Sequence, residues 1–533
     1  VYARSAFSLV TACTAREQVQ DAVGCQQDLR WLSEQVPDDA SIARYRTEAA
    51  AQLTSLPLPL SHLEELFGEL RALHEAHPGV HEFLAEGAAR LAPRYAHAER
   101  WAQARELYGW LVRFAREHPG DQDVAECMGG AAANVAVAFL KHGWFAEAQE
   151  LHAQLEEIAR EAPSPTLRSV QAHSAKNLAI HAASEERMAE ARRYFQEVAA
   201  LTVADPSAPL EPPIAAALRG SFASAAAALV RALGGAGLDD EARETYERLH
   251  ALAWNYPSEE KLFDEAGRAA CMLIWDYLHH HRTWDIVRLY ERVRDYPGFP
   301  CMAQWRAKAG ADVVWQLWYA DDPATLIRSF DEHHAFCLGA AGDADVREWF
   351  ARTAARISGQ WQESSAFRVR EAIAQSQGVS FEQIAAAMPH MAIDSLRDPV
   401  MNVDDDALAP RMRTLYRDLG ELSRAYPDDT ELRDARASMA LKLATTLWSL
   451  FSLRFPALLM LPPGVESEEA FRAWRQNVHA EYGSFLGGAG GAELAELHRD
   501  LAGLYGSHPG NAAIRAQYGR SLGLMLGLEY YAP

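Results

Sequence analysis

Two clusters in the sequence contain residue types that can act as metal ligands. His279–His281 form one cluster, and His333, His334 and Cys337 form another with spacings of one, three and four residues. Imidazole and thiolate groups one helical turn apart are ligands that zinc accepts, but a structural zinc site needs four of them. Nothing in the sequence brings the two clusters together. The sequence therefore favours a polar helix end for the first cluster and a partly buried histidine face for the second.

Two glycine-rich runs, Gly234–Gly237 and Gly487–Gly491, have the composition of phosphate-binding loops. Neither has the lysine and hydroxyl residue of a P-loop, and neither follows a strand pattern. Both come just before a helical pattern, so we expect turns between paired helices. Asp404–Asp406 lacks the alternation and the glycine of a calcium loop. Its negative charge is more typical of a helix N-terminus.

Catalytic motifs are absent from the sequence. It has no G-x-S-x-G elbow, no H-E-x-x-H helix and no convincing pair of a nucleophile and a base. We therefore expect a protein that is not an enzyme and that uses no metal and no cofactor. A metal-dependent enzyme built on the histidine clusters is the third alternative.

The charge of the chain limits its partners. The 533 residues carry a net charge of −22. Nucleic-acid binders need a basic face that replaces the counterions of the phosphates, and anionic membrane surfaces attract basic segments. We therefore expect neither nucleic acid nor membrane as a partner. The charge also has a simpler explanation, which is that it keeps the protein soluble.

Cysteine and lysine usage suggests a compartment. The six cysteines are scattered and form no C-x-x-C pair, which argues against a disulfide framework and against a zinc ribbon. A reducing, cytoplasmic location follows. Only five of the 51 basic residues are lysine, a bias that is typical, together with alanine-rich helices, of a GC-rich bacterial genome.

No segment has the pattern of a membrane anchor. The most apolar stretch, Leu447–Leu461, is interrupted by Arg454 and Pro456, so we predict no transmembrane helix. The string LVTAC at Leu9–Cys13 resembles a lipoprotein cleavage box, but the apolar region before it is too short, and we expect a helix with a buried cysteine. The sequence begins with valine, so either a leader has been removed or the chain is part of a longer protein.

One skeleton recurs along the chain. It consists of an apolar residue, a ring-bearing residue directly after it, apolar residues at +4 and +7, and a proline at +12. In LYGWLVRFAREHPG these are Leu107, Tyr108, Leu111, Phe114 and Pro119, and six further copies begin at Leu66, Leu151, Tyr194, Thr245, Leu415 and Leu497. The prolines of the first five copies are 41, 44, 43 and 51 residues apart, and those of the last two are 82 apart.

This skeleton predicts helices that end at fixed turns. Positions i, +1, +4 and +7 form one apolar stripe on a helix, and the proline cannot continue that helix. Alanine-rich helical stretches such as Gly129–His142 lie between the copies. A helix pair that recurs at a fixed period predicts an all-α solenoid of antiparallel helix pairs.

The pattern resembles the tetratricopeptide repeat family, whose helix pair has two small residues at close-packing positions, aromatic residues nearby and a proline at the end. With Gly143–Phe145 as the turn within the pair, Ala136 and Ala148 take the small positions and Phe139 an aromatic one. The next repeat has Ala179 and Ala191 at the small positions, and the resemblance implies that its Phe195 faces inward. The period of 41 to 44 residues exceeds the family's usual length of about 34. The resemblance covers about residues 60–297 and 410–530 and implies a right-handed superhelix.

The copies divide the sequence into four segments. We predict an N-terminal helical cap at 1–58, a repeat array at 59–297, a divergent helical region at 298–410 and C-terminal repeats at 411–533. The divergent region carries no clean copy of the skeleton. It includes Met388–Pro410, the best candidate for a loop or hinge between two arrays.

The resemblance also implies a binding face, because the first helix of each pair lines a concave groove in tetratricopeptide relatives. Asn134 and Asn177 are equivalent residues on this face, 43 apart. An amide offers both a donor and an acceptor, so it can hold a peptide backbone. His173, Lys176 and Lys141 fall on the same face. Packing contacts between helices are the alternative for both asparagines.

We therefore expect a protein-interaction scaffold that binds a peptide or a partner protein in the groove of the helical array. A regulatory or sensor region of a larger bacterial signalling protein is the alternative.

Overall fold

Short turns separate the α-helices of the computed structural model, which describes residues 2–37, 39–202, 210–320, 322–376, 405–454 and 488–526, and residues 469, 473 and 476. These ranges contain no β-strand. The chain divides into two compact units, residues 1–269 (unit 1) and 270–533 (unit 2), and each unit is described by itself. The division of the sequence into four segments stays a prediction.

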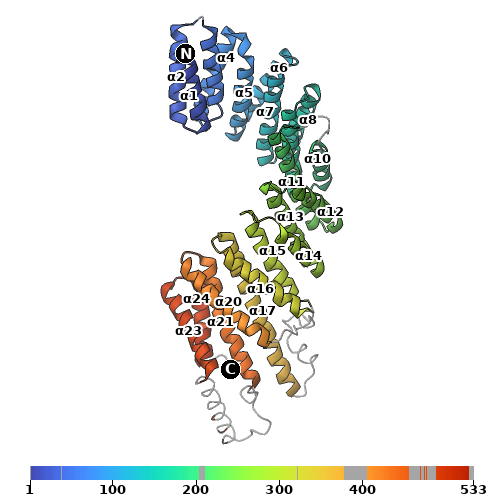
Figure 1. The fold of residues 1–533 in the computed structure, drawn as a ribbon, viewed down its shortest axis with the longest axis vertical. Coiled ribbons are helices and arrows are strands. Elements are labelled where there is room, and N and C mark those ends of the chain that lie inside the picture. Colours follow the sequence, from blue (N-terminus) through green and yellow to red (C-terminus); the bar gives the residue numbers. More distant parts are fainter. Residues whose placement is uncertain are drawn as a thin grey trace. The chain divides into compact units, whose positions relative to one another are not determined.

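Unit 1 is a succession of helices, labelled in Figure 1. They are α1 (Tyr2–Ala15), α2 (Val19–Gln35), α3 (Ala40–Leu53), α4 (Leu60–Ala76), α5 (His81–His97), α6 (Trp101–Glu117), α7 (Gln122–Lys141), α8 (Phe145–Glu161), α9 (Pro165–Ser184), α10 (Met188–Thr202), α11 (Pro212–Gly235), α12 (Asp239–Asn255) and α13 (Glu260–His279), inside which the boundary between the units falls. The string LVTAC lies in α1, where Cys13 is half-buried.

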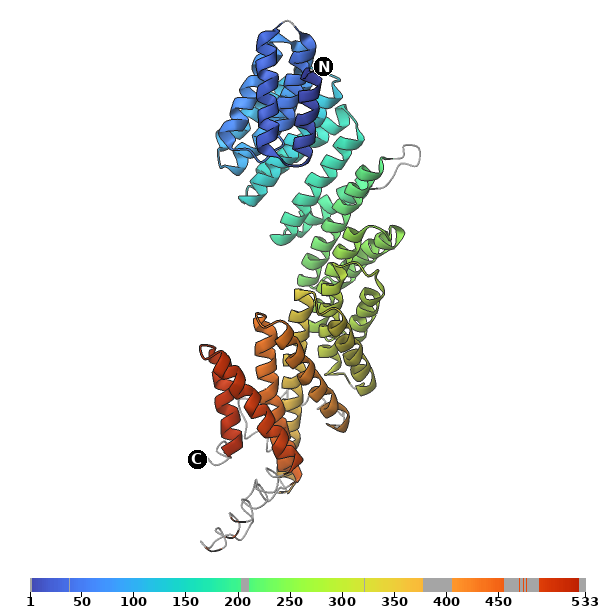
Figure 2. The same cartoon turned by 60° about the vertical axis from the view of Figure 1, so that its left-hand side comes forward.

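The helices of unit 1 stack as pairs. The first helices of the pairs pack directly on one another, α5 on α7, α7 on α9 and α9 on α11. The second helices lie over the lines between them, since α8 contacts both α7 and α9 and α10 contacts both α9 and α11. Figures 1 and 2 show these helices side by side in the order of the sequence. The prediction of an all-α solenoid of helix pairs is confirmed.

The predicted apolar stripe is the core of the stack. Leu111 and Leu155, on the second helices α6 and α8, are fully enclosed. Pro119 and Pro163 each lie two residues beyond the end of their helix, where the skeleton predicted a stop. Gly143 forms the predicted turn between α7 and α8 with φ at +75°, a conformation that glycine adopts without steric cost.

Capping and alanine content explain why the first helices form. The Asp121 side chain accepts a hydrogen bond from the Val124 backbone N–H at 3.0 Å and caps α7. The Ser164 hydroxyl does the same for Leu167 at 3.0 Å, and Pro165 opens α9. Alanine has the highest helix propensity, and the small Ala136 and Ala148 are buried as predicted, so neighbouring helices approach closely.

Two first helices, α7 and α11, are long and apolar enough to cross a membrane by length and composition. In each, 56% of the apolar window is buried inside the protein. A core helix of a soluble protein meets the same criteria, so these helices are weak evidence for a membrane span.

Unit 2 repeats the same arrangement. Its helices are α14 (Thr283–Asp295), α15 (Met302–Leu317), α16 (Pro323–Gly339), α17 (Ala344–Ser376), α20 (Asp405–Ala425), α21 (Thr430–Arg454), α23 (Ala489–Ser507) and α24 (Ala512–Leu526). Here α15 packs on α17, α17 on α21 and α21 on α24. Most of the predicted loop Met388–Pro410 lies outside the described residues, and its last six residues belong to α20.

Two further copies of the skeleton lie where the sequence showed none. The stripes of α14 and α16 place buried residues at positions i, +1 and +4, namely Leu289, Tyr290, Val293 and His333, His334, Cys337. His333 lies 82 residues before Leu415, which is the step from Leu415 to Leu497. Both copies lack the proline at +12, so the pattern with proline does not find them.

Side chains on consecutive second helices meet in a repeated contact, which we call the ring ladder. Each rung joins two second helices that follow one another in the stack. The ring at skeleton position +1 of the first contacts the side chain at skeleton position +3 of the second. The Tyr108 hydroxyl lies 3.0 Å from Gln154 Oε1, and His152 Nε2 lies 3.0 Å from Glu197 Oε1. The other rungs are Phe67–Trp110, Phe195–Arg248, His334–Asp418 and Tyr416–Asp500.

The chemistry of each rung follows its ring. Tyrosine and histidine rings face hydrogen-bonding side chains that act as acceptors, whereas the phenylalanine rings face a tryptophan or an arginine cation, which are the partners that an apolar π-face prefers. Because the same offset recurs in both units, we expect the rungs to help set how consecutive helix pairs sit on one another within a unit.

Adjacent glycines of α7 test this packing. A Cβ atom at Gly129 would lie 2.4 Å from Leu167 Cδ2 and 3.0 Å from Leu155 Cδ1, while a Cβ at Gly130 would meet nothing within 4 Å. We expect Gly129→Ala to lower the free energy of unfolding by about 1–3 kcal/mol because it overpacks the core. Gly130→Ala should raise it by about 0.5–1 kcal/mol because alanine favours a helix. Denaturant unfolding measures both, and the same sign of change in the two variants would contradict this packing of α7.

Candidate functional site

All five residues predicted to bind a partner lie on two first helices of unit 1. Asn134 and Lys141 on α7 are exposed, as is His173 on α9, whereas Lys176 and Asn177 on α9 are half-buried. The amide nitrogen of Asn177 is enclosed and has no acceptor among the described residues. The two equivalent asparagines therefore differ, since Asn134 is exposed whereas Asn177 is half-buried with its amide nitrogen enclosed.

Asn134 lines a pocket of about 610 Å³ on α3, α5 and α7. Two arginines, Arg44 and Arg90, face five carboxylates there, those of Glu48, Glu82, Glu86, Asp123 and Glu126. Arg90 pairs with Glu86 at 2.5 Å, and Arg44 lies 4.0 Å from Glu82. The pocket therefore has an excess of negative charge. Burial raises the pKa of the Glu48 carboxyl, and Glu82 and Glu86 raise it further against the opposing effect of Arg44.

His173 and Lys176 meet a third basic residue that the sequence did not point to. Lys176 Nζ lies 3.3 Å from His173 Nδ1. Lys261 of α13 lies across α11, where a Cβ at Gly220 would be 3.2 Å from its Nζ. Burial, with added repulsion from Lys176 and Lys261, lowers the pKa of His173 to about 4. Burial and Lys261 also lower the pKa of Lys176 to about 8. At neutral pH the imidazole is uncharged and accepts a hydrogen bond from Lys176.

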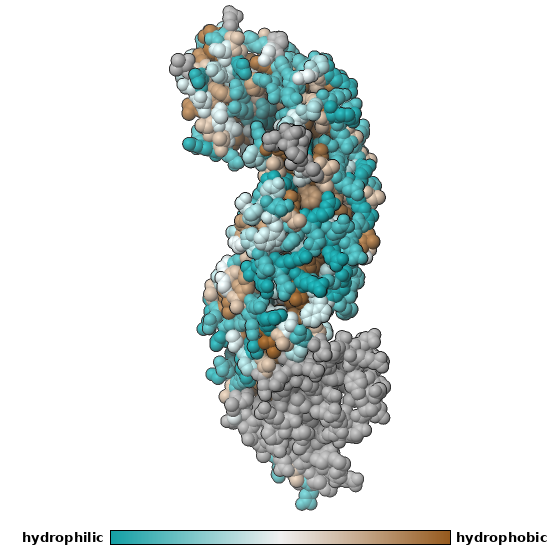
Figure 3. All heavy atoms as spheres, turned by 45° about the vertical axis from the view of Figure 1, so that its right-hand side comes forward, coloured by the Kyte–Doolittle hydropathy of each residue, from teal (hydrophilic) through white to brown (hydrophobic). Residues whose placement is uncertain are grey.

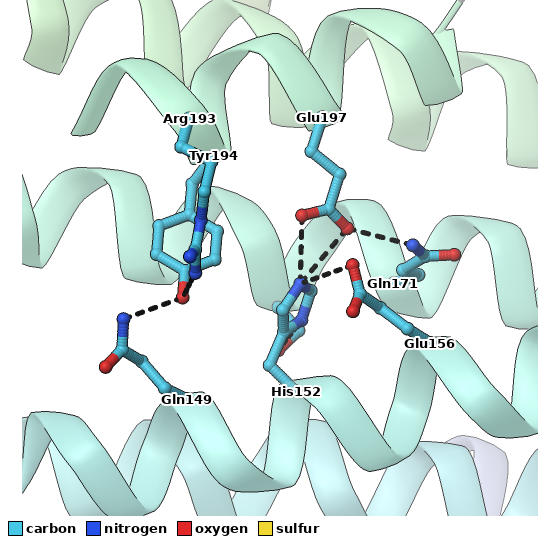
Figure 4. Close-up of polar contacts among 8 residues, drawn as sticks. Gln149, His152, Glu156, Gln171, Arg193, Tyr194 and Glu197 are labelled. Carbon is cyan, nitrogen blue, oxygen red and sulfur yellow. Dashed lines mark hydrogen bonds and ion pairs between the residues drawn. The ribbon is translucent and has the colours of Figure 1, made fainter. Parts of the chain in front are cut away.

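A second cluster, between α8, α9 and α10, has the composition of a metal site. One ligand atom each of His152, Glu156 and Glu197 lie within 4.8 Å of one another. His152 points at Glu197 in Figure 4, and its Nε2 lies 3.0 Å from Glu197 Oε1 and 3.9 Å from Glu156 Oε1. The Gln171 amide donates to Glu197 at 2.8 Å, and His152 Nδ1 lies 3.0 Å from the Ser174 hydroxyl.

The repeat explains this cluster without a metal. His152–Glu197 is one rung of the ring ladder, and the contact between His152 and Ser174 has a counterpart in unit 2, where His498 Nδ1 lies 2.9 Å from the Ser521 hydroxyl. Glu156 is the residue outside this pattern, and its side chain is 43% exposed. The buried polar atoms of His152 are thus satisfied by protein groups.

The other candidate clusters take structural positions. His279 ends α13, and His279–His281 are exposed, as expected of a polar helix end. His333 Nε2 lies 3.1 Å from Thr353 Oγ1, while His334 Nε2 lies 3.1 Å from Asp418, so the two imidazoles face different partners. Burial lowers the pKa of His333 to about 3 and raises that of Cys337 to about 12, which keeps both groups neutral.

The glycine runs and the aspartate run also lie at helix ends. Gly234–Gly237 closes α11 ahead of α12, as predicted. Gly487 lies outside the described residues, and the rest of its run forms the cap and first turn of α23. Asp404 is also outside the described residues, and Asp405 opens α20 as expected of a helix N-terminus.

Unit 2 has a pocket of about 710 Å³ on α20, α21 and α23. Five arginines and three carboxylates line it. Arg413 pairs with Glu493 and Arg436 with Asp500, which also completes a ladder rung. This pocket therefore has an excess of positive charge, opposite to that of the pocket in unit 1.

One face of the described part of the chain is mainly hydrophilic. The face in Figure 3 shows hydrophobic residues as small separate spots among polar ones. Large exposed apolar side chains such as Trp31, Trp254 and Trp284 lie on different helices.

Comparisons with solved structures add distant similarities in fold, of which one is described. No protein-family model and no curated protein matches the sequence. A chain from a study of the phosphorylation switch that controls the interaction between cadherin and beta-catenin is similar in structure, with a TM-score of 0.38 and 12% sequence identity over 83% of this chain and 84% of that chain. These values are too low to assign a family, a partner or an activity.

The cluster around His152 gives a matched pair of variants. Glu197→Ala removes the partner of both His152 and Gln171, and we expect it to cost about 1–3 kcal/mol because it leaves buried polar atoms unpaired. Glu156→Ala should cost less than about 1 kcal/mol, since an exposed ion pair contributes little. Thermal unfolding with zinc and with chelator is the measurement. A zinc-dependent rise in melting temperature that both variants abolish would instead make the cluster a metal site.

Proposed function

We propose that the chain is a protein-interaction scaffold whose first-helix face in unit 1 binds a segment of a partner protein. The observation that supports this most is the pocket on α3, α5 and α7, which opens on the first helices and is lined by Asn134. An exposed amide beside a hollow can hold a partner's backbone through its donor and its acceptor.

The first-helix face and the second-helix face of the stack differ in how many polar side chains are available to a partner. Second helices use their polar side chains on one another, through rungs such as Tyr108–Gln154 and His152–Glu197. First helices pack through small residues and keep charged side chains such as Asp123 and Glu126 at the pocket. A partner therefore meets more uncommitted polar groups on the first-helix face.

The charge of the pocket suggests the chemistry of the segment. Five carboxylates against two arginines favour a partner with a lysine or arginine side chain at this position. Charge complementarity of this kind raises the association rate and selects partners more than it adds affinity.

We also propose that the repeats are an extended form of the tetratricopeptide type. The buried Ala136 and Ala148 and the turn at Gly143 support this assignment. The longer period is accommodated in first helices such as α7 and α9, each of 20 residues.

A charge reversal on each face tests the binding function. The full chain is used to recover a partner, which is then purified and titrated by calorimetry. Glu126→Arg, in the pocket on α7, should weaken binding on the order of 10-fold because it sets like charges against each other. Glu157→Arg, on the exposed side of the second helix α8, is the control and should leave the affinity unchanged. Equal loss in both variants, or loss only in the control, would refute the proposed face.

A further inference from the structure

Two lysines of unit 1 form a cationic cluster that has no counter-ion. Lys176 of α9 and Lys261 of α13 make no ion pair within the described part of the chain. Other lysines are satisfied differently: Lys308 Nζ pairs with Asp312 at 2.8 Å, and Lys442 donates to the Ala355 carbonyl. With 73 acidic residues against 51 basic ones, carboxylates are plentiful, so their absence from this cluster is a specific feature.

Three helices bring the two ammonium groups together. Gly220 leaves α11 without a side chain at the point where Lys261 crosses it, and a Cβ there would lie 3.2 to 3.5 Å from the end of the lysine side chain. On α9, the Nζ atom of Lys176 lies 3.3 Å from the Nδ1 atom of His173. His173 and Lys176 lie one turn apart on α9, and the charge of Lys261 lowers the pKa of both groups, so its ammonium lies near them.

The carboxylates nearest in sequence are engaged elsewhere. Glu265 on α13 accepts a hydrogen bond from the Ser224 hydroxyl at 2.7 Å and pairs with Arg268. The negative charge of Asp264 also stabilises the charged form of Arg268 and so raises its pKa, against the larger effect of burial, which lowers it. Glu259, at the start of α13, pairs with Arg219. The charge of Lys176 and Lys261 is therefore not neutralised by these groups of the same elements.

We propose that Lys176, Lys261 and His173 form a binding site for an oxyanion, the chemistry shared by a phosphate group and a carboxylate. The half-buried ammonium of Lys176 and the ammonium of Lys261 repel each other and are stabilised by an anion placed between them. Lysine binds phosphate as a compact point charge with three donors. The site is independent of the acidic pocket on α3, α5 and α7, and it stands or falls without the proposed partner.

Calorimetric titration of the full chain with inorganic phosphate and with acetate tests the site. In buffer free of other oxyanions, phosphate should bind saturably at one site per chain. Lys176→Met and Lys261→Met should each weaken phosphate binding by on the order of 10-fold or more, because hydrogen bonds to charged groups are the strong ones. Arg243→Met removes an exposed cation on the second helix α12 and should leave binding unchanged. Binding should also weaken as the pH rises through about 8, where Lys176 loses its charge.

A stability measurement separates binding from folding. In the absence of oxyanions, Lys176→Met should hold or raise the melting temperature, because it removes a half-buried cation that has no partner. Phosphate should raise the melting temperature of the natural chain more than that of this variant. Absence of saturable binding, equal loss of binding in Arg243→Met, or a lowered melting temperature of Lys176→Met without phosphate would overturn the proposal.

The same titration identifies the source of the anion. If the partner recovered through the first-helix face is displaced by phosphate from the natural chain but not from Lys176→Met, the oxyanion is carried by that partner. If phosphate binds without displacing the partner, the ligand is a free ion, and the site is still present.

Discussion

Consecutive helix pairs are held in register by the contact between a ring on one second helix and the side chain two residues beyond the next ring. The buried stripe supplies most of the stability, since removal of a residue such as Leu111 or Leu155 from a well-packed core costs about 2–5 kcal/mol. A rung such as Tyr108–Gln154 contributes only about 0.5–1.5 kcal/mol. The stripe alone, however, is compatible with small slides and rotations between pairs. The directional rung selects one of them, and the rest of the array follows from that choice.

Much of this architecture can be predicted from the sequence, because it depends on local patterns. The stripe, the proline stop and the turn at Gly143 each act within one helix or one connection, so their spacing is visible along the chain. The ladder is not visible in this way, because it joins residues about 45 positions apart, such as His152 and Glu197. Nothing marks the two as neighbours until the helices are stacked.

The cluster His333, His334 and Cys337 shows how one spacing serves two chemistries. Its intervals fit a zinc site, but they are also the i, +1 and +4 positions of the skeleton. The structure uses them as a buried stripe and a ladder rung, with His334 facing Asp418. The proline at +12 is absent from this copy, which removed the one signal that would have separated the two interpretations.

The sequence predicted only some of the residues around the candidate sites, because helical periodicity acts within one helix. Helical periodicity correctly placed Asn134, His173 and Lys176 on first helices. It treated Asn134 and Asn177 as equals, whereas packing encloses only the second. Lys261 was missed because it is brought to α9 by the intervening α11, through the space that Gly220 leaves open. Whether two residues on different helices lie near each other depends on the helices packed between them and on the size of the side chains at that point.

A double-mutant cycle between Tyr108 and Gln154 tests the ladder most directly. Tyr108→Phe and Gln154→Ala are made singly and together, and the free energy of unfolding is measured for each chain. If the rung joins the two second helices, the pair should show a coupling energy of about 0.5–1.5 kcal/mol. Tyr108 and Glu197 belong to different rungs, so a cycle between them should show no coupling energy. Additive effects of Tyr108→Phe and Gln154→Ala would contradict the account, because the helix pairs would then be in register without the contact.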